Sequence, residues 1–187
     1  MRVIAGTHGG RRLKAPPGRG TRPTSDRVRE AVFSMLGELA GAHVMDLFAG
    51  TGALGIEALS RGAAKAVFVE RDAAAARILA ANLATLGFAS ERFELRRGEA
   101  LAALRTAAER GEFYDLILID PPYGDAARLG PRLSALLPPL LAPGARVVTE
   151  SDRRGPLRLE APASTERRYG DTSITISTSP WPDPTAR

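Results

Sequence analysis

Four consecutive apolar residues, Leu116-Ile117-Leu118-Ile119, are followed directly by Asp120-Pro121-Pro122-Tyr123. Strands of a parallel sheet are buried on both faces and read as continuous apolar runs of this kind. Two successive prolines can neither continue a helix nor pair inside a sheet, and the residue before a proline favours extended geometry, so the turn is stiff. In open α/β sheets ligands bind at the carboxyl ends of the strands. The segment therefore predicts an α/β fold with a binding site at this turn.

The rest of the chain alternates between strand-like and helix-like patterns. Short apolar segments at 44–48, 66–69, 93–95 and 145–149 predict strands, and segment 173–177 alternates hydroxyl and apolar residues as an antiparallel strand near a sheet edge does. Asp72 can cap a helix that runs to Leu86, and 100–110 reads as another helix. This alternation is typical of βαβ units in a single α/β domain.

Two further helices are predicted from apolar stripes. The first can be capped by Thr24, Ser25 or Asp26, and its stripe consists of Val28, Val32, Met35, Leu36 and Leu39. The second has a leucine stripe whose end Pro143-Gly144 signals, formed by Leu129, Leu133, Leu136, Leu137 and Leu140.

The groups in the stiff turn suit an amino group on a planar ring. Asp120 offers a carboxylate, the prolines offer carbonyl oxygens, and Tyr123 offers a flat ring on which a base can stack. The amine of adenine or guanine is a poor nucleophile because its lone pair is delocalised, and two acceptors that hold its N–H bonds would localise that pair. The alternative is a rigid surface turn without chemistry. Its position directly after a buried strand favours the functional interpretation.

A glycine-rich segment, Gly50-Thr51-Gly52-Ala53-Leu54-Gly55, follows the predicted strand 44–48. Glycines at this spacing let the backbone approach a cofactor and let the helix pack on the strand, and an acid about 20 residues further on, here Glu70, takes ribose hydroxyls. The glycine spacing alone would also fit a flexible turn or a dinucleotide-binding site. Asp46, before the glycines, would repel a pyrophosphate but attract the ammonium of a methionine moiety. The segment therefore favours S-adenosylmethionine.

With these motifs the chain resembles a known family, the bacterial small-subunit rRNA guanine-N2 methyltransferases that modify guanine 966 of 16S rRNA. The likeness covers most of the chain, and the block from Arg22 to Glu30 narrows it from amino-group methyltransferases in general to this family. The matching segments are Ile4-Ala5-Gly6, Gly10-Arg11-Arg12-Leu13, Arg22 to Glu30, Asp46 to Gly55, Glu57 to Gly62, Asp120 to Tyr123 and Tyr169-Gly170-Asp171-Thr172.

The resemblance implies a Rossmann-like class I methyltransferase fold, with a mostly parallel seven-stranded sheet, a reversed strand near its edge and a small N-terminal β-hairpin arm. It implies catalysis at Asp120, Pro121, Pro122 and Tyr123, with the ribose at Glu70 and the adenine near Glu99, where relatives usually carry Asp. The implied cofactor-binding set is Asp46, Phe48, Ala49, Gly50, Thr51, Gly52, Glu70, Arg71, Glu99 and Ala100.

Positive charge is concentrated near the start of the chain. Residues 1–30 carry a net charge of +6, whereas the whole chain carries +5, so the remainder is close to neutral. A basic arm beside a nearly neutral domain suits a polyanionic substrate. The chain has 24 Arg and only two Lys, so we rely on the clustering and not on the choice of arginine. The resemblance makes 16S rRNA, alone or within the small subunit, the expected partner of Arg2, Arg11, Arg12, Lys14, Arg22, Thr24 and Arg27.

Composition limits the remaining possibilities. The chain has no cysteine and two histidines, which excludes a disulfide scaffold and a thiolate nucleophile and leads us to expect no metal. It has no apolar run of membrane-spanning length, so we expect no membrane association and a cytoplasmic location. The expected organisation is a basic hairpin arm at 1–20, a methyltransferase domain at 21–179 and a flexible tail at 180–187, in a monomer.

Other functional classes remain open at this stage. A DNA adenine-N6 methyltransferase would share Asp120 to Tyr123, although only about forty residues precede the catalytic domain, which is little for reading duplex sequence. Asp46 disfavours a nicotinamide-dependent oxidoreductase. A non-catalytic RNA-binding module would leave the glycine segment and the proline turn unexplained, and Asp120 disfavours glutamine methylation, for which relatives carry Asn at this position.

Overall fold

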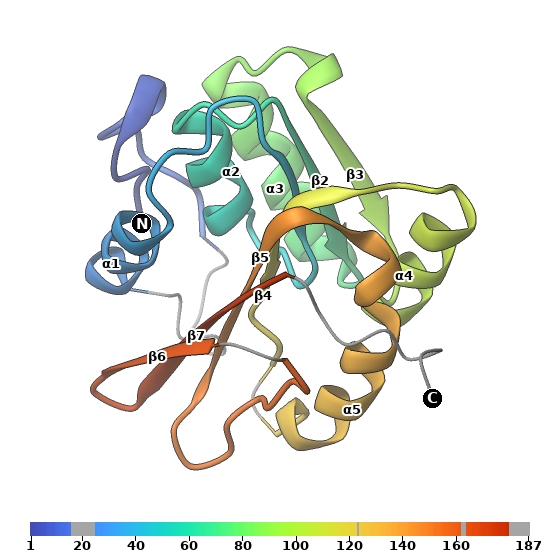
Figure 1. The fold of residues 1–187 in the computed structure, drawn as a ribbon. Coiled ribbons are helices and arrows are strands. Elements are labelled where there is room, and N and C mark those ends of the chain that lie inside the picture. The colour runs from blue at the N-terminus through green and yellow to red at the C-terminus, as the bar shows by residue number, and fades with distance from the viewer. Residues whose placement is uncertain (16–24, 123, 162–163, 180–187) are drawn as a thin grey trace.

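The computed structural model describes residues 1–15, 25–122, 124–161 and 164–179 of the 187-residue chain. A seven-stranded sheet with the strand order β3-β2-β1-β4-β5-β7-β6 forms its centre, with helices on both faces (Figure 1). The strands are β1 (His43–Asp46), β2 (Lys65–Glu70), β3 (Phe93–Arg97), β4 (Tyr114–Ile119), β5 (Leu141–Asp152), β6 (Ser164–Tyr169) and β7 (Thr172–Thr178). The α-helices are α1 (Asp26–Leu36), α2 (Ala53–Ser60), α3 (Ala73–Leu86), α4 (Ala100–Glu109) and α5 (Ala126–Leu136).

The sheet is parallel from β3 to β5, and β7 pairs antiparallel with both β5 and β6. The predicted α/β fold with a reversed strand near the edge is therefore confirmed. The edge strand β6 was not predicted, because most of its residues are polar and all but the last are exposed, so it lacks an apolar face. Within the described part of the chain, no helix is long and apolar enough to cross a bilayer.

Two apolar clusters lie on opposite faces of the sheet. On one face, β-strand residues such as Phe68 and Leu118 pack with side chains of α1, α2 and α3. On the other face, Ile117 and Ile119 pack with side chains of α4 and α5. Because successive residues of β4 feed both clusters, its apolar run is continuous, as expected for a parallel strand covered on both faces.

The helices begin where their caps predict, and three expectations about them were wrong, the first being Leu39, which lies beyond the end of α1 at Leu36. Ser25 accepts a hydrogen bond from Val28 N (3.2 Å) at the start of α1, and Asp72 accepts two at the start of α3. Met35, predicted to belong to the apolar stripe of α1, is 37% exposed. The leucine stripe does not remain helical up to Pro143, because Pro138 and Pro139 have no backbone N–H with which to continue the helical hydrogen bonds; a 3₁₀ turn (Pro138–Leu140) follows instead.

The N-terminal segment forms a short paired arm. Val3 N donates to Arg11 O and Gly10 N donates to Val3 O, both at 2.9 Å, around an antiparallel bridge between Arg2 and Arg12. A 3₁₀ turn (Gly6–His8) lies between the two paired segments. Val3 is buried in the same cluster as α1 and α2, so this arm packs on the main core. The division of the chain at residue 20 remains a prediction, and the tail 180–187 lies outside the described residues.

A buried carboxylate on α2 holds the arm in place. Glu57 is fully buried and accepts hydrogen bonds from Ile4 N (2.7 Å), Ala5 N (3.0 Å) and Arg61 Nε (2.7 Å). Ser60 Oγ donates to Ala5 O at 2.6 Å. The segment Glu57 to Gly62, noted in the sequence only as a match, therefore has a structural role, because its side chains satisfy the backbone of the arm.

We expect Gly6→Ala to destabilise the arm more than Gly10→Ala does. Both glycines have φ +80, but a Cβ at Gly6 would lie 1.9 Å from Ser60 O, whereas a Cβ at Gly10 would meet nothing within 4 Å. The two variants therefore share the left-handed strain of about 1–2 kcal/mol, and Gly6→Ala adds an overpacking cost of about 1–3 kcal/mol. Urea unfolding of both variants measures the difference, and equal losses would contradict the close approach of the arm to α2.

Candidate functional site

The register of the sheet brings three loops together at its carboxyl edge. Asp46, the last residue of β1, lies between Phe68 of β2 and Leu118 of β4. Beyond the strand, Leu47 N donates to Leu118 O (2.9 Å) and Ala49 N donates to Val69 O (3.0 Å). The glycine loop after β1 therefore starts between the carboxyl ends of β2 and β4, which is the location expected for a ligand in an open α/β sheet.

The glycines of this loop are required for two physical reasons. Gly52 has φ +86, and a Cβ there would lie 2.2 Å from Leu79 Cδ1, so both its conformation and its packing favour glycine. A Cβ at Gly55 would lie 2.3 Å from the Phe68 ring, so this glycine lets α2 pack closely on β2. At Gly50, with φ +53, the space is open apart from Phe48 O at 4.0 Å. The backbone at Gly50 is therefore accessible to a ligand.

Glu70, at the end of β2, connects the glycine loop to the next helix. One carboxylate oxygen accepts from Gly50 N and the other from Asp72 N, each at 2.7 Å. The side chain is only partly buried, so its oxygens keep lone pairs for a further donor. The acid predicted from its spacing therefore lies in direct contact with the glycine loop.

Glu99, predicted to lie near an adenine, is at the surface beside Arg71, another predicted cofactor residue. Arg71 Nη1 and Glu99 Oε1 form an ion pair at 3.5 Å, with 60% and 68% of their side chains exposed. Ala100 is buried at the first position of α4. Glu99 is the residue before α4, and Arg71 is the residue after β2. Their ion pair therefore joins the start of α4 to the end of β2.

Asp46 is almost completely buried beneath the glycine loop. It is 1% exposed; its Oδ2 accepts from Gly55 N at 2.9 Å, and its Oδ1 is buried without a hydrogen-bond partner among the described residues. Burial, with a smaller contribution from the charge of Glu70, raises the pKa of Asp46 to about 7. The carboxylate therefore orients the first turn of α2 from beneath the loop, and its Oδ1 keeps unused hydrogen-bonding capacity.

Asn82, on α3, joins the N-terminal arm to the glycine loop and was not found in the sequence. Its Nδ2 donates to Thr51 O (3.0 Å) and Lys14 O (3.1 Å), and its Oδ1 accepts from Lys14 N (2.8 Å). The residue is 2% exposed. The available signal was a lone amide on the buried side of an alanine-rich helix, next to Leu79 and Leu83.

The proline turn follows β4 as predicted. Asp120 is partly buried, Pro121 is buried and Pro122 is exposed, and none of them belongs to a helix or strand. Tyr123 lies outside the described residues. Since β4 is adjacent to β1, the turn lies beside the glycine loop at the same edge of the sheet.

The residues predicted to contact RNA lie mainly on the surface. Arg2 pairs with Asp26 (3.2 Å), and Arg11 donates to Thr85 O (3.2 Å). Arg12, Lys14 and Arg27 are exposed; Arg22 and Thr24 lie outside the described residues.

Arg29, in contrast, is fully buried. It donates to Arg2 O and to Asp26 (2.8 Å), so it fixes α1 to the arm. Burial lowers the pKa of Arg29. Arg29 belongs to the segment Arg22 to Glu30, on which the family resemblance depends. Its contacts show that this arginine has a structural role.

The strand order and the site at the carboxyl edge define the class I fold of S-adenosylmethionine-dependent methyltransferases. A solved structure described as the putative methyltransferase yhhF from Escherichia coli superposes with a TM-score of 0.79 and 33% identity, over 95% of this chain and 97% of that one. An RNA methyltransferase from Salinibacter ruber in complex with S-adenosyl-L-homocysteine, at 20% identity and a TM-score of 0.66, shares the fold.

The family model described as "Conserved hypothetical protein 95" matches residues 1–178, and the chain belongs to this family. The putative rRNA methyltransferase YlbH of Bacillus subtilis is 45% identical over 138 residues, which are 73% of this chain and 72% of that protein. Ribosomal RNA small subunit methyltransferase D of Escherichia coli is 42% identical over 124 residues, 66% of this chain and 60% of that protein. The predictions of family, fold class and S-adenosylmethionine as the cofactor are confirmed.

We expect the stability of the ligand-free protein to depend on pH through Asp46. Its pKa is raised from 3.8 to about 7, so the folded state holds this proton more tightly than the unfolded state. The contribution of Asp46 to stability is therefore complete below pH 4 and is lost as pH rises to about 7, by on the order of 4 kcal/mol at most.

Asp46→Asn lacks this titration and keeps an oxygen for Gly55 N. The free energy of unfolding of wild type relative to this variant should therefore fall as pH rises from 4 to 7, which urea titrations at several pH values measure. A difference that stays constant with pH would contradict the buried carboxylate.

Proposed function

We propose that the chain transfers a methyl group from S-adenosylmethionine to the exocyclic N2 amine of a guanine in 16S rRNA, at guanine 966. The observation that carries the proposal is the position of Asp120 and Pro121 directly after β4, beside the glycine loop after β1. Acceptors for an amine and a cofactor loop thus share one edge of the sheet. The names of the relatives that act on ribosomal RNA support the substrate class.

The described residues fit the cofactor. The unpartnered Oδ1 of Asp46 suits a cationic ammonium, the fixed carboxylate of Glu70 suits ribose hydroxyls, and the open space at Gly50 allows close approach of a ligand to the backbone. Glu99 would reach the adenine, with Arg71 and Ala100 beside it. Phe48, Ala49, Thr51 and Gly52 complete the proposed binding loop.

The bound cofactor supplies an electrophilic methyl group, and the protein's task is to orient the amine. Asp120 and the Pro121 carbonyl accept the N–H bonds of the guanine amine and localise its lone pair, and Tyr123 stacks on the base. In favourable cases, positioning of this kind lowers the reaction barrier by about 7 kcal/mol or more. After transfer, the nitrogen is acidic and loses its proton to Asp120 or to water. The target guanine has to be unpaired for the turn to reach it.

The basic arm is the proposed RNA contact. Arg2, Arg12, Lys14 and Arg27 are exposed, and Asn82 ties the backbone of Lys14 to that of Thr51. An RNA strand bound along the arm would therefore lead towards the cofactor loop. With ribosomal RNA as its substrate, a monomeric enzyme in the cytoplasm is the simplest arrangement.

We expect Asp120→Asn to reduce methyl transfer to small ribosomal subunits from cells without the native enzyme by on the order of 100-fold. The neutral amide is a weaker acceptor for the guanine amine, whereas cofactor binding should be retained. Transfer from labelled S-adenosylmethionine is followed by nucleoside analysis. Asp125→Asn, five residues further along the same loop, is the matched control and should retain activity.

N2-methylguanosine at one position, lost in Asp120→Asn only, is the expected result. Label in DNA adenine would replace the proposal with an adenine-N6 methyltransferase. Equal activity of Asp120→Asn and wild type would remove Asp120 from the reaction.

Glu70→Gln should weaken cofactor binding by on the order of tenfold or more. A glutamine offers only one oxygen to the two backbone donors, Gly50 N and Asp72 N, so the glycine loop loses one of its fixed contacts. Calorimetric titration with S-adenosylhomocysteine measures the change. Glu91→Gln, an exposed substitution of the same kind on the 3₁₀ turn Ser90–Arg92, should bind as wild type does, and equal affinity of both variants would contradict the role of Glu70.

A further inference from the structure

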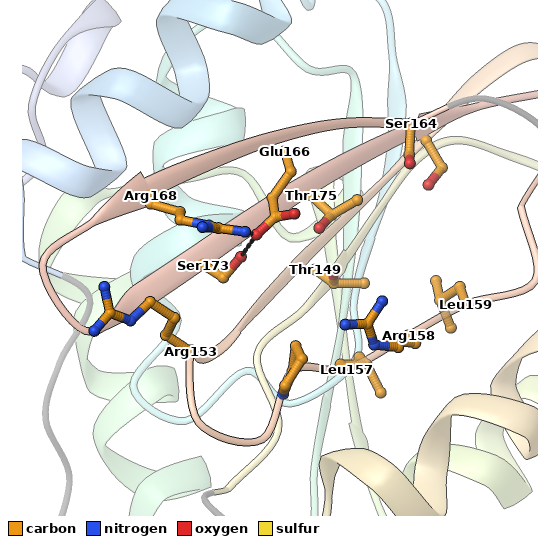
Figure 2. A pocket seen from close by; sticks show the side chains of 12 residues that line it. Thr149, Arg153, Leu157, Arg158, Leu159, Ser164, Glu166, Arg168, Ser173 and Thr175 are labelled. Atoms are coloured by element: carbon orange, nitrogen blue, oxygen red, sulfur yellow. Dashed lines mark hydrogen bonds and ion pairs between the residues drawn. The ribbon is translucent and has the colours of Figure 1, made fainter.

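A second polar site lies on the sheet face that carries α4 and α5. A pocket of about 310 Å³ is formed between strands β5, β6 and β7 and the segment 153–159 (Figure 2). Its floor carries the hydroxyls of Thr149, Ser173, Thr175 and Ser177. Ser173, Thr175 and Ser177 are residues of β7, and Ile174 between them is buried in the cluster on the opposite face. The hydroxyl-bearing face of β7, noted in the sequence as half of an alternation, therefore lines a pocket.

The segment that covers this pocket is fixed to the fold at both ends. Arg153 N donates to Asp171 O (2.8 Å) in the turn between β6 and β7. Glu160 N donates to Ser134 Oγ (2.9 Å) on α5, and Gly130 of α5 packs so closely that a Cβ there would lie 2.3 Å from Arg158 O. The pocket is therefore preformed, which lowers the entropy cost of binding.

The charged side chains around the pocket favour an anion. Three arginines, Arg153, Arg158 and Arg168, and one carboxylate, Glu166, line it (Figure 2). Glu166 already accepts from Arg168 (3.0 Å) and Ser173 Oγ (2.9 Å), and these hydrogen bonds lower its pKa. The charge of Arg158 also contributes to the lowered pKa of Glu166. Three guanidinium groups thus outnumber the one carboxylate, and they lie beside the hydroxyls of Thr149, Thr175 and Ser177, a combination that suits phosphate oxygens.

The basic end of the pocket lies at the same edge of the sheet as the proline turn. Thr149 of β5 pairs with Ile119, the last residue of β4, and β5 continues to Asp152. Because β7 is antiparallel, Ser173 lies at this edge opposite Ser151. Two strand spacings, about 10 Å, separate β4 from β7. Arg153, directly after the end of β5, therefore lies near the proline turn along this edge.

We propose that this pocket binds a backbone phosphate of the substrate RNA, near the guanine held at Asp120, through Arg153, Arg158 and the hydroxyls on its floor. The proposal rests on the proposed function. The N-terminal arm packs with α1 and α2 on one face of the sheet, whereas Leu157 and Leu159 pack on the other. The two basic surfaces therefore lie on opposite faces of the sheet.

The test compares an Arg153→Ala, Arg158→Ala double variant with a control double variant, Arg105→Ala, Arg110→Ala. Both remove two positive charges, and the control residues lie on α4 or at its end, away from the pocket. Binding to a 16S rRNA fragment that contains the target guanine is measured at several salt concentrations. For single-stranded contacts, each lost phosphate contact should reduce the slope of log K against log salt by about 0.7.

The pocket variant should show a shallower salt slope and a KM for RNA raised on the order of tenfold, with kcat and cofactor affinity unchanged. An Arg153→Lys, Arg158→Lys double variant keeps both positive charges and should therefore restore part of the slope of log K against log salt. A slope and KM equal to those of the control, in an enzyme that methylates RNA normally, would overturn this proposal alone. The proposal would also be overturned if the pocket variant bound inorganic phosphate more weakly than wild type but bound the RNA fragment equally well. A wild-type enzyme that transfers no methyl group to RNA would instead overturn the proposed function.

Discussion

The pairing of β1 with β4 is the constraint on which the rest of the site depends. Asp46 opposite Leu118 places the end of β1 two residues from Asp120 along the neighbouring strand, so the glycine loop and the proline turn share one edge. A register shift of one residue would reverse the faces of β1 and bury the wrong side chains. Such a shift would also move Asp46 away from Gly55 N, which donates to it at 2.9 Å. The core thereby determines the position of both loops.

Carboxylates then fix the loops that the strands deliver. Asp46 holds Gly55 N, Glu70 holds Gly50 N and Asp72 N, and Glu57 holds the backbone of the arm. Each carboxylate accepts hydrogen bonds from backbone N–H groups that would otherwise lack a partner within the protein. Asp46 and Glu70 also keep oxygen lone pairs that these hydrogen bonds do not use. The same two side chains therefore stabilise the fold and can bind a ligand.

Much of this arrangement could be predicted from local patterns. The run 116–119, the cap at Asp72 and the glycine spacing each report on their own backbone, and the structure confirms the elements that they predicted. What the sequence did not reveal depends on contacts between distant segments: Asn82 with Lys14 and Thr51, the buried Arg29, and the arginines that 153–158 and 168 bring to one pocket. The polar edge strand β6 lacked the apolar alternation by which strands are recognised.

The central claim is that the cofactor and the amine acceptors meet at this edge of the sheet. A crystal structure of the protein with S-adenosylhomocysteine tests it most directly. We expect ribose hydroxyls within hydrogen-bonding distance of Glu70, and the sulfur over the loop after β1, facing Asp120 and Pro121. A ligand bound elsewhere, or a sulfur that faces away from Asp120, would contradict it.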